Sequence, residues 1–465
     1  MIKILPIGKS GRLHCMVDAL SNSSRAKKLY TLSEVYNPGL VEKSEEVEKV
    51  PRIDDVETVR RYARKVKPDF AIIGPEEPLC TGVVDMLTDE LGIPCVGPTK
   101  ALAQLECSKS FTRELLSKYS IPGNPEYKIF RNLDGLESYL RRRGEFVVKP
   151  DGLTGGKGVK VYGEHLHSIE EAVQYCKSLF ETNPKVVIEE KLDGEEFSFQ
   201  SFCDGRHVVD TLAVQDHKRA FDGDNGPNTG GMGSYSCEDH SLPFLSKNHI
   251  REASRINSAV AEALWNESRK GNKSGKGFKG ILYGGFIVTR HGLRLLEYNA
   301  RFGDPEVMNV LPLLKTDFID VCEAIINGTL DKISIIFEKK ATVCKYVVPR
   351  GYPTNPEKGE PIITTNLPRP SDKLKMYYAA VNIKPEGLCL TGSRALAFVG
   401  IGDNLSEAEQ IAEDAASRVG GPVRHRKDIG TSGLIQRRID HMRKIMKGEK
   451  TSHLDSTRAV ANLIR

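Results

Sequence analysis

The chain has 465 residues, of which 39% are hydrophobic and 28% charged, so it is long enough for about two to four domains with their own cores. Its 67 Lys and Arg residues nearly balance 62 Asp and Glu residues and leave a net charge of +5, which excludes the basic excess typical of nucleic-acid or membrane binding but allows small anionic substrates. Ten scattered cysteines without a Cys-x-x-Cys pair predict reduced, mostly buried thiols rather than disulfides or a zinc site.

The chain begins MIKILPIGKSGRLHC, where Lys3 and Pro6 interrupt the short apolar run, so we expect no signal peptide. No run of about 18 apolar residues follows. Together these features predict a cytoplasmic protein with no membrane partner and no nucleic-acid partner.

Residues 1–107 alternate short apolar strands with helical patterns. This alternation predicts a parallel sheet covered by helices, forming an N-terminal parallel α/β substrate domain. The predicted strands are IKILPIG, KLYTLSE, PDFAIIG and IPCVGP, and the predicted helices are DDVETVRRYARKV and TGVVDMLTDELG.

Residues 108–330 open with the predicted helix SKSFTRELLSKYS and continue with short strands linked by glycine. Such strands suggest antiparallel pairing, with a lid subdomain at about 125–192. Within this region, residues 266–280 are rich in Gly, Ser and Lys, which is typical of a mobile solvated loop. The predicted strands are EFVVKP, KGVKVYG, KVVIEEKL and EFSFQSFCDG.

Two regions follow. Residues 331–430 mix strands with the helix LSEAEQIAEDAASRV and predict a small mixed α/β domain. Residues 431–465 are a basic, helical tail that either packs on the C-terminal region or serves contacts between chains. The fold class is therefore α/β and α+β multidomain.

The segment EFVVKPDGLTGGKGVKVYG carries a nucleotide signal. A strand ends in Lys149, a glycine-rich turn carries Lys157, and a second strand follows, so the glycines sit at a hairpin tip and not at the mouth of a helix. The glycines allow close approach to an anion, and the two lysines supply charge for a polyphosphate. A lid over ATP is one interpretation, and a plain glycine-rich hairpin is the other.

Downstream, VVIEEKLDGEEFSFQ places a strand with two terminal acids before a tight Asp193-Gly194 turn. Such a hinge exposes backbone groups that can read an adenine edge, and a nearby carboxylate can hold ribose hydroxyls. Alone, this signal is weak.

The stretch RLLEYNARFGDPE begins as a predicted strand, and charged and polar residues are concentrated at the end of that strand. Strict alternation predicts that Leu295, Glu297 and Asn299 share one face and that Leu296 and Tyr298 share the other. Hard oxygen donors side by side suit Mg²⁺. The following Asp304, with a proline after it, predicts the N-cap of a helix; a polar edge strand before a capped helix is the alternative interpretation.

In this order, the lid, hinge and strand end resemble the ATP-grasp ligases, whose fold holds Mg-ATP between two α+β subdomains. Those enzymes phosphorylate a carboxylate and pass the acyl phosphate to an amine or thiol. The motifs RFGDPEVM, QDHKRAFDGDNGPNTGGMGSYS, VVKPDGLTGGKGV and IIGPEEPL are further similar to the glycinamide ribonucleotide synthetase (phosphoribosylamine-glycine ligase) family of purine biosynthesis. The resemblance covers residues 1–430.

The resemblance implies a set of site residues. Glu297 and Asn299 would bind Mg²⁺ or Mn²⁺, and Arg301 would help to neutralise the transferring phosphoryl group. The residues implied at ATP are Lys109, Lys149, Gly155, Gly156, Lys157, Gly158, Glu189, Glu190, Leu192 and Glu196, with Glu195 open as the alternative ribose ligand. Those implied at glycine and phosphoribosylamine are the catalytic Asp216 and Lys218, the loop Asn228, Thr229, Gly230, Gly231 and Met232, and Gly8, Gly11 and Arg12.

The first loop departs from the family pattern Gly-Ser-Gly-Gly-Arg-Glu-His-Ala. Here it is GKSGRLHC, with Ser10 in place of a glycine and Leu13 in place of the acid. The retained Gly8, Gly11 and Arg12 still allow the loop to hold the ribose phosphate. Divergence, an altered substrate or decay of the site would each explain the change. His14 receives no proton-transfer role.

The sequence therefore predicts an ATP-dependent enzyme that joins glycine to phosphoribosylamine through glycyl phosphate, acting as a monomer or small homo-oligomer. Two alternatives remain: another ATP-grasp carboxylate-amine ligase with changed substrates, and a non-catalytic nucleotide-binding sensor. The charged strand end argues against a sensor, which needs no metal-clamped phosphate.

Overall fold

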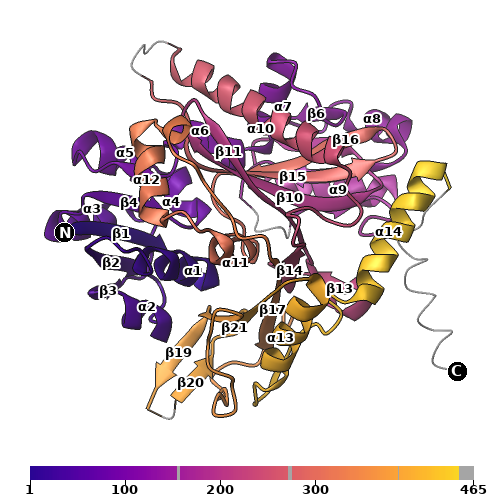
Figure 1. The fold of residues 1–465 in the computed structure, drawn as a ribbon. Helices are drawn as coiled ribbons and strands as arrows, with labels where there is room; N and C mark the ends of the chain where they lie inside the picture. Colours follow the sequence, from indigo (N-terminus) through magenta and orange to yellow (C-terminus); the bar gives the residue numbers. More distant parts are fainter. Residues whose placement is uncertain (154–157, 271–274, 386, 450–465) are drawn as a thin grey trace, which may run out of the picture.

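The computed structural model describes residues 1–153, 158–270, 275–385 and 387–449. Its N-terminal strands form a five-stranded parallel sheet in the order β3-β2-β1-β4-β5, which confirms the predicted parallel α/β region (Figure 1). The elements are β1 (Ile2–Gly8), α1 (Ser10–Ser21), β2 (Lys27–Ser33), α2 (Pro38–Lys43), β3 (Glu46–Lys49), α3 (Val56–Val66), β4 (Phe70–Ile73), α4 (Glu76–Thr81), α5 (Val83–Asp85), the π-helical turn η1 (Met86–Glu90), β5 (Cys95–Val96) and α6 (Lys100–Cys107).

One predicted helix of this region is interrupted. Gly82, with φ of 94°, ends α4 in the left-handed conformation and separates it from α5 and η1. Glycine adopts this conformation without the steric cost that a β-carbon brings. The predicted helix TGVVDMLTDELG is therefore divided among short helical segments. Of their side chains, only the apolar ones are buried, as the amphipathic pattern indicates.

The predicted lid subdomain is a four-stranded antiparallel sheet in the order β6-β9-β7-β8 with its own apolar core. Phe146, Val148 and Ile188 from the sheet pack with Leu140 and Cys176 from the two helices. The elements are α7 (Lys109–Lys118) before the subdomain and β6 (Tyr127–Phe130), α8 (Leu136–Arg143), β7 (Phe146–Pro150), β8 (Lys160–Val161), α9 (Ile169–Phe180) and β9 (Val186–Glu190) within it.

The large central sheet crosses the boundary predicted at residue 330. Its path is β16-β15-β10-β11-β14-β17-β21-β18, with β22 paired to β17, and β14 joins β17 where Ser234 faces Cys344 (Figure 1). The ATP-grasp and C-terminal regions therefore share one sheet. Its strands are β10 (Glu195–Asp204), β11 (Val208–Asp216), β14 (Gly233–Ser236), β15 (Lys279–Thr289), β16 (Gly292–Asn299), β17 (Ala341–Pro349), β18 (Leu374–Tyr378), β21 (Leu396–Gly402) and β22 (Val423–Arg424).

Shorter elements complete the described fold. The insertion predicted to be mobile is entered from a long helix and left through β15, and its residues 271–274 lie outside the described residues. The elements are β12 (Arg219–Phe221), η2 (Asp222–Asp224), β13 (Asn225–Asn228), α10 (Lys247–Ser268), α11 (Val307–Val310), η3 (Leu311–Leu313), α12 (Phe318–Asn327), η4 (Leu330–Lys332), β19 (Val381–Lys384), β20 (Gly387–Leu390) and α13 (Leu405–Ser417).

The basic tail forms the helix α14 (Ser432–Lys447), coloured yellow in Figure 1. Thr431 caps it by accepting a hydrogen bond from the backbone N–H of Leu434. Leu434, Met442 and Ile445 are buried, and the helix contacts β10 and β15 of the central sheet. The tail thus packs on the ATP-grasp strands; residues 450–465 lie outside the described residues.

The prediction that the chain has no disulfide is wrong. Cys80 in α4 and Cys107 in α6 form a disulfide, with their Cα atoms 6.0 Å apart. The spacing of 27 residues carries no recognisable signal, because only the packing of α4 against α6 brings the two thiols together. The other eight cysteines are free, and all but Cys237 are buried, as predicted.

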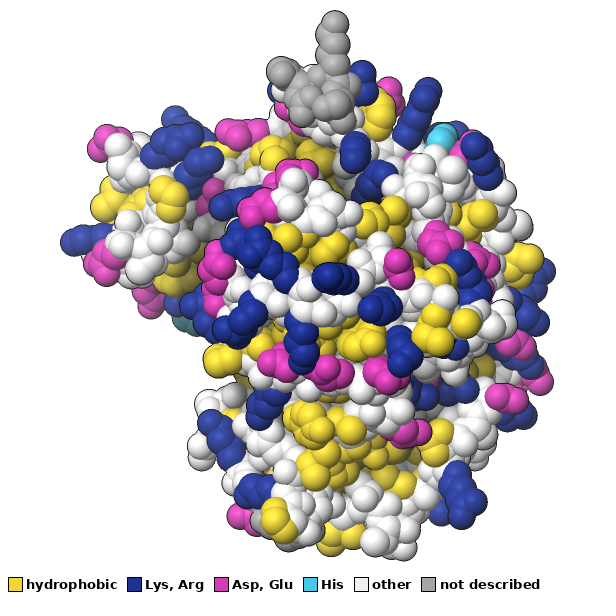
Figure 2. Space-filling view, turned by 90° about the vertical axis from the view of Figure 1, so that its left-hand side faces the viewer, with side chains coloured by type: hydrophobic (Ala, Val, Ile, Leu, Met, Phe, Trp, Pro, Cys, Tyr) yellow, Lys and Arg dark blue, Asp and Glu magenta, His cyan; other side chains and the backbone are white. Residues whose placement is uncertain are grey.

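Charge on one face of the molecule is mixed. Figure 2 shows Lys and Arg side chains interspersed with Asp and Glu on the side of the molecule where α3 and α5 lie. Among the described residues, none of the helices has both the length and the apolar character needed to cross a membrane.

Candidate active site

Strand β16 carries a bulge next to the predicted metal ligands. Gly285 lies opposite Glu297 and Phe286 lies opposite Leu295, which leaves Leu296 as the extra residue. Leu295 is therefore buried in the core, while Leu296 lines a small cavity together with Glu297. The prediction that Leu295 shares a face with Glu297, and that Leu296 lies on the other face, is wrong. The extra residue in the bulge shifts the alternation, so that residues before it point to the opposite faces from those predicted.

Beyond the bulge, Glu297 and Asn299 are two residues apart and share one face. Burial raises the pKa of Glu297, but Lys218 and Lys149 outweigh it and hold the pKa below its ordinary value. Within the described parts of the chain, no hydrogen bond or ion pair engages this carboxylate. An ionised carboxylate beside an amide oxygen fits a hard divalent cation such as Mg²⁺.

Charged side chains from the ends of β10 and β11 meet Glu297 of β16 at a small cavity. Glu196 comes from β10, Asp216 ends β11, and Lys218 lies two residues further, with its Nζ 3.7 Å from a carboxylate oxygen of Glu196. The Asp216 charge raises the pKa of Lys218, while burial raises the pKa of Asp216. The structure thus brings together predicted residues that are about 20 to 100 positions apart in the sequence.

The predicted phosphate-binding lysines flank this cavity. Helix α7 begins at Lys109, whose Nζ donates to the carbonyl of Gly152 at 2.8 Å. The carboxylate of Asp151 accepts from the backbone N–H of Ser110, so the end of β7 is fixed to the start of α7. Lys149, on β7, donates to the carbonyl of Leu296 in the bulge at 3.1 Å.

Glu189 is held inside the protein. Its carboxylate is 2.7 Å from Nε of Arg113 and 2.8 Å from Nζ of Lys149. Burial raises the pKa of Glu189, but Arg113 and Lys149 bring it down to about 2. This carboxylate is therefore used to orient Lys149.

At the hinge, the two neighbouring acids differ in how far their side chains are exposed. The Glu195 side chain is only 3% exposed, whereas that of Glu196 is 51% exposed at the cavity. Glu190 accepts a hydrogen bond from the backbone N–H of Glu126, and Leu192 is half-buried. Glu196 is thus the acid that a ribose could reach.

The predicted glycine-rich lid falls largely outside the described residues. Gly155, Gly156 and Lys157 belong to the segment 154–157. Gly158 is described, and its carbonyl accepts a hydrogen bond from the hydroxyl of Tyr175 at 2.8 Å.

The predicted helix start at Asp304 is wrong, because α11 begins only at Val307. The Asp304 carboxylate instead binds the N-terminus of α1. One oxygen accepts from the Ser10 hydroxyl at 2.7 Å and from the backbone N–H of Arg12 at 3.3 Å. The other accepts from the Tyr346 hydroxyl at 2.7 Å. The N-terminus of α1, predicted to attract a phosphate, already holds this carboxylate.

The altered loop fits this arrangement. Ser10, which replaces the family glycine, has φ of 77°, a conformation that usually favours glycine. Its hydrogen bond to Asp304 accounts for a serine there. Gly11 allows close packing, since a β-carbon would lie 2.5 Å from the hydroxyl oxygen of Tyr346. Gly8 likewise approaches Pro75.

Two predicted arginines are enclosed by acids and carbonyls. Arg12 donates to the carbonyl of Phe302 at 2.6 Å. Arg301 is 3.0 Å from Glu76 and 2.8 Å from Glu106, and one of its Nη atoms donates to the Asn299 amide oxygen at 3.3 Å. These contacts keep Arg301 beside the predicted metal ligand Asn299 and Arg12 beside the backbone of Phe302, and neither side chain is open to solvent.

The predicted substrate loop lies next to Lys218. The backbone N–H of Thr229 donates to the Lys218 carbonyl at 2.7 Å, and that of Met232 donates to the His217 carbonyl. Arg394, from the C-terminal region, donates to the carbonyl of Gly230 at 2.7 Å and also to that of Gly231. Asn228 ends β13 and is exposed.

His14 is a packed histidine, consistent with the absence of a predicted role. Its Nδ1 accepts from the backbone N–H of Tyr378 at 2.9 Å, and its ring lies against Tyr377 and the backbone of Gly39. Burial lowers the pKa of His14 to about 4.

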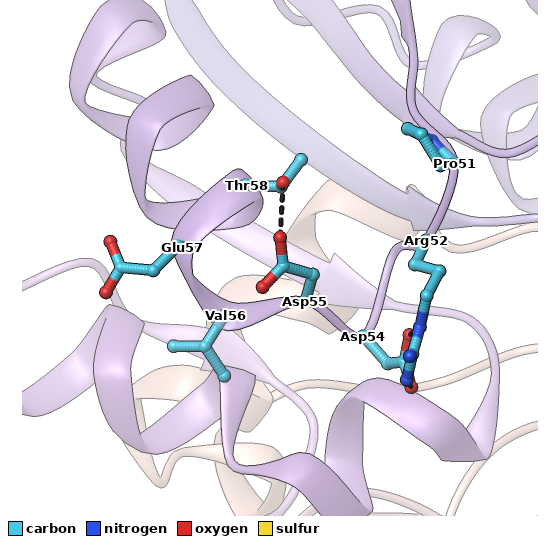
Figure 3. Close-up of a pocket in the computed structure, with 7 residues that line it drawn as sticks. All are labelled: Pro51, Arg52, Asp54, Asp55, Val56, Glu57 and Thr58. Carbon is cyan, nitrogen blue, oxygen red and sulfur yellow. Dashed lines mark hydrogen bonds and ion pairs between the residues drawn. The ribbon is translucent and has the colours of Figure 1, made fainter.

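Figure 3 shows a separate pocket of about 430 Å³ before and at the start of α3, where Thr58 donates to Asp55 at 2.6 Å. None of the predicted site residues lines it. Its lining is Pro51, Arg52, Asp54, Asp55, Val56, Glu57 and Thr58.

Sequence reasoning missed four residues that hold the site: Glu76, Glu106, Arg113 and Arg394. Arg113 lies four positions after Lys109, on the same face of α7, and this spacing could have revealed it. Glu76 lies in the quoted motif IIGPEEPL, but its partner Arg301 is 225 positions away. The partners of Glu106 and Arg394 also come from distant segments, and no local pattern marks these two residues.

Three family descriptions match the chain. They are the N domain of phosphoribosylglycinamide synthetase over residues 2–106, its ATP-grasp (A) domain over 107–307 and its C domain over 342–432. Relatives named phosphoribosylamine-glycine ligase are 48% identical in Methanocaldococcus jannaschii, with 96% of this chain and 100% of the relative covered, and 46% identical in Methanocella arvoryzae, with 95% and 99% covered.

Solved structures agree. The phosphoribosylamine-glycine ligase of Thermotoga maritima matches with a TM-score of 0.75 and 26% identity, over 92% of this chain and 100% of that one. The biotin carboxylase domain of Hydrogenobacter thermophilus 2-oxoglutarate carboxylase, at 14% identity and a TM-score of 0.70 over 98% of each chain, shares the fold. The chain therefore belongs to the phosphoribosylglycinamide synthetase family.

Proposed function

We propose that the chain ligates glycine to phosphoribosylamine with ATP, giving glycinamide ribonucleotide, ADP and phosphate. The observation that carries this proposal is the ionised carboxylate of Glu297, which lines a cavity together with Lys218 and also feels the positive charges of Lys149 and Lys109. A negative group surrounded by cations, without a salt-bridge partner in the described structure, suits a site that receives a metal nucleotide and an anionic acceptor.

In the proposed reaction, a carboxylate oxygen of glycine attacks the γ-phosphorus of ATP, and the bond to the β-phosphate oxygen breaks to release ADP. The amine of phosphoribosylamine then attacks the acyl carbon of glycyl phosphate, loses a proton and displaces phosphate. Glu297 and Asn299 would hold Mg²⁺ or Mn²⁺, which when bound supplies positive charge to the phosphate oxygens. Arg301 orients Asn299 through its 3.3 Å hydrogen bond.

We assign the remaining predicted residues by their positions. Lys109, Lys149 and the lid contact the phosphates, and Glu196 holds the ribose beside Glu190 and Leu192. Lys218, with Asp216 behind it, neutralises the glycine carboxylate and the developing acyl phosphate. The loop from Asn228 to Met232, which the backbone N–H groups of Thr229 and Met232 fix beside Lys218, borders the small substrates.

The sugar phosphate is assigned to the surface next to the first loop, where Gly8 lets the backbone come close. Gly11 supports the loop by packing against Tyr346. Arg12 supports this loop through Phe302. The division into regions 1–107, 108–330, 331–430 and 431–465, a cytoplasmic location and a monomer or small homo-oligomer stay predictions.

The test is an omission assay. Purified protein is given Mg-ATP, glycine and freshly made phosphoribosylamine, and ADP release is measured with each omitted in turn. We expect ADP release to require both substrates. Release that needs glycine but accepts another amine would support a ligase with changed substrates, and tight ATP binding without turnover would indicate a sensor.

A further inference from the structure

Neighbouring residues at the ends of β10 and β11 point to opposite sides. On β10, Glu196 faces the cavity and Glu195 is buried behind it. At the end of β11, Asp216 and Lys218 line the cavity, while His217 between them has a fully buried side chain. Each residue proposed to meet substrate therefore has a sequence neighbour on the back of the sheet.

Helix α14 lies against this back side. Arg438 places one Nη 3.5 Å from a carboxylate oxygen of Glu195 and the other 2.5 Å from Asp224. Asp224 lies 3.6 Å from Nδ1 of His217, which makes no hydrogen bond in the described parts of the chain. One guanidinium thus links the back of both strand ends.

A second contact from α14 reinforces the hinge. Nδ1 of His441 is 2.7 Å from Glu195, and its Nε2 is 3.6 Å from Asp193 in the turn before β10. From the neighbouring strand β11, the Gln215 amide donates to Glu195 at 3.3 Å and to the Glu196 carbonyl at 3.0 Å. The position of Glu196 therefore depends on groups that α14 holds.

The Arg438 ion pairs lie on the opposite face of the sheet from the pair between Lys218 and Glu196. Across the cavity, Lys218 and Glu196 approach to 3.7 Å, and both are about half exposed. Such a pair has little rigidity of its own, because exposed long side chains are weakly held. The pairs of Arg438 are better able to fix the spacing of the two strand ends, because its side chain is only 19% exposed and that of Glu195 only 3%. Arg426, 3.0 Å from Asp224, shares in holding that acid.

We propose that Arg438 is a positioning residue for the ligation: from helix α14 it fixes the hinge that carries Glu196 and the turn behind Lys218, so that nucleotide and acceptor meet in register. This inference rests on the proposed function for the roles of Glu196 and Lys218. It gives the tail outside the C-terminal region a part in the reaction.

The test uses the full-length Arg438→Met, which keeps the length of the side chain but removes its charge. The matched control is Arg443→Met on the same helix, where the arginine is exposed and pairs only with Asp440 in the described structure. The dissociation constant for Mg-ATP is measured by calorimetry, and kcat/KM by ADP release, at a temperature at which circular dichroism shows every variant folded.

We expect Arg438→Met to lower kcat/KM roughly tenfold or more and to weaken Mg-ATP binding, because a small displacement of positioned groups is costly. Arg438→Lys should recover part of the loss, and Arg443→Met should match the parent. Glu195→Gln should show a loss of its own that is not additive with Arg438→Met.

A folded Arg438→Met with unchanged nucleotide affinity and unchanged kcat/KM would overturn the proposal, as would losses that add fully with Glu195→Gln. If Arg438→Met does not fold, Arg438→Lys and Glu195→Gln decide by the same two measurements. If the parent protein binds Mg-ATP but has no ligase activity, the proposed function fails, while the calorimetric comparison still tests the positioning role.

Discussion

At the ends of β10 and β11, charged side chains on the two faces of the sheet differ in exposure and in pairing. Toward the cavity, Glu196 and Lys218 are half exposed and 3.7 Å apart, and Glu297 nearby has no salt-bridge partner in the described structure. Toward the back, Glu195 and Asp224 are paired with Arg438. Acids that are exposed or lack a salt-bridge partner in the described structure thus face the candidate site. Acids that are paired with Arg438 instead fix the backbone of the same strand ends.

The largest effect is expected on the open side, at the metal position. Glu297→Gln keeps the shape of the side chain but removes the charge that a divalent cation needs, so kcat should fall by about 10³-fold or more with little change in melting temperature. The measurements are kcat across a magnesium titration and the melting temperature. Asn299→Leu should behave similarly.

The matched control for Glu297→Gln is Leu295→Asn, on the buried side of the bulge. An amide there meets packed apolar side chains, so the free energy of unfolding should fall by about 3 kcal/mol, with activity lost through unfolding. If Glu297→Gln retained near-normal kcat at low magnesium, the metal assignment would be wrong.

Behind the open side, the Cys80–Cys107 disulfide joins the helices that carry Glu76 and Glu106, the two acids that hold Arg301. Removing it with Cys107→Ser should lower the free energy of unfolding by about 3 kcal/mol, given a closed loop of 27 residues. Denaturant unfolding with and without dithiothreitol measures this. An equal effect of dithiothreitol on parent and variant would contradict a disulfide in solution.

A smaller loss is expected from the first loop. Arg12→Ala removes the donor to the Phe302 carbonyl and the neighbour of Glu76, 3.6 Å away, so stability should fall by about 2 kcal/mol. We expect the KM values for all three substrates to change together, because the joint between regions loosens. A rise confined to the KM for phosphoribosylamine would instead show that Arg12 contacts the sugar phosphate.

The smallest effect concerns pH on the back side. Burial lowers the pKa of His441, but hydrogen bonds to Asp193 and Glu195 raise it to about 9, with Arg438 also facing this cluster. The folded pKa lies above the ordinary value of about 6.5, so stabilisation is full below pH 6.5 and is lost as the pH rises through 9.

The corresponding variant is His441→Gln, which cannot carry the charge. At pH 6 it should be less stable than the parent by on the order of 1–2 kcal/mol, after allowance for partial exposure, and at pH 10 the two should converge. Urea unfolding at both pH values gives the difference. A gap that is independent of pH would show that His441 acts by packing alone.

The sequence predicted the parts of the fold and site that local pattern controls. The parallel sheet and the antiparallel lid sheet follow from alternation and turn residues, and the predicted helix from Ser108 is α7, which begins one residue later because Ser108 is its N-cap. Glu297 was found because two hard oxygen donors at the end of a strand are unusual, and the family resemblance gave them a role.

What the sequence did not predict depends on packing between distant segments. The bulge at Leu296 is set by pairing with β15. Asp304 binds Ser10 at the start of α1, although the two residues are 294 positions apart in the sequence. The two cysteines meet only when α4 packs on α6. The pairs of Arg438 with Glu195 and Asp224 likewise require the tail to lie across the central sheet.

The central claim is that this site activates the glycine carboxylate by phosphorylation, and transfer of isotopic oxygen tests it most directly. Glycine labelled with ¹⁸O in its carboxylate is turned over with Mg-ATP and phosphoribosylamine, and the released phosphate is analysed by mass spectrometry. The account predicts that one labelled oxygen per turnover appears in the phosphate. Label that stays wholly in the amide product and the solvent, with none in the phosphate, would contradict it.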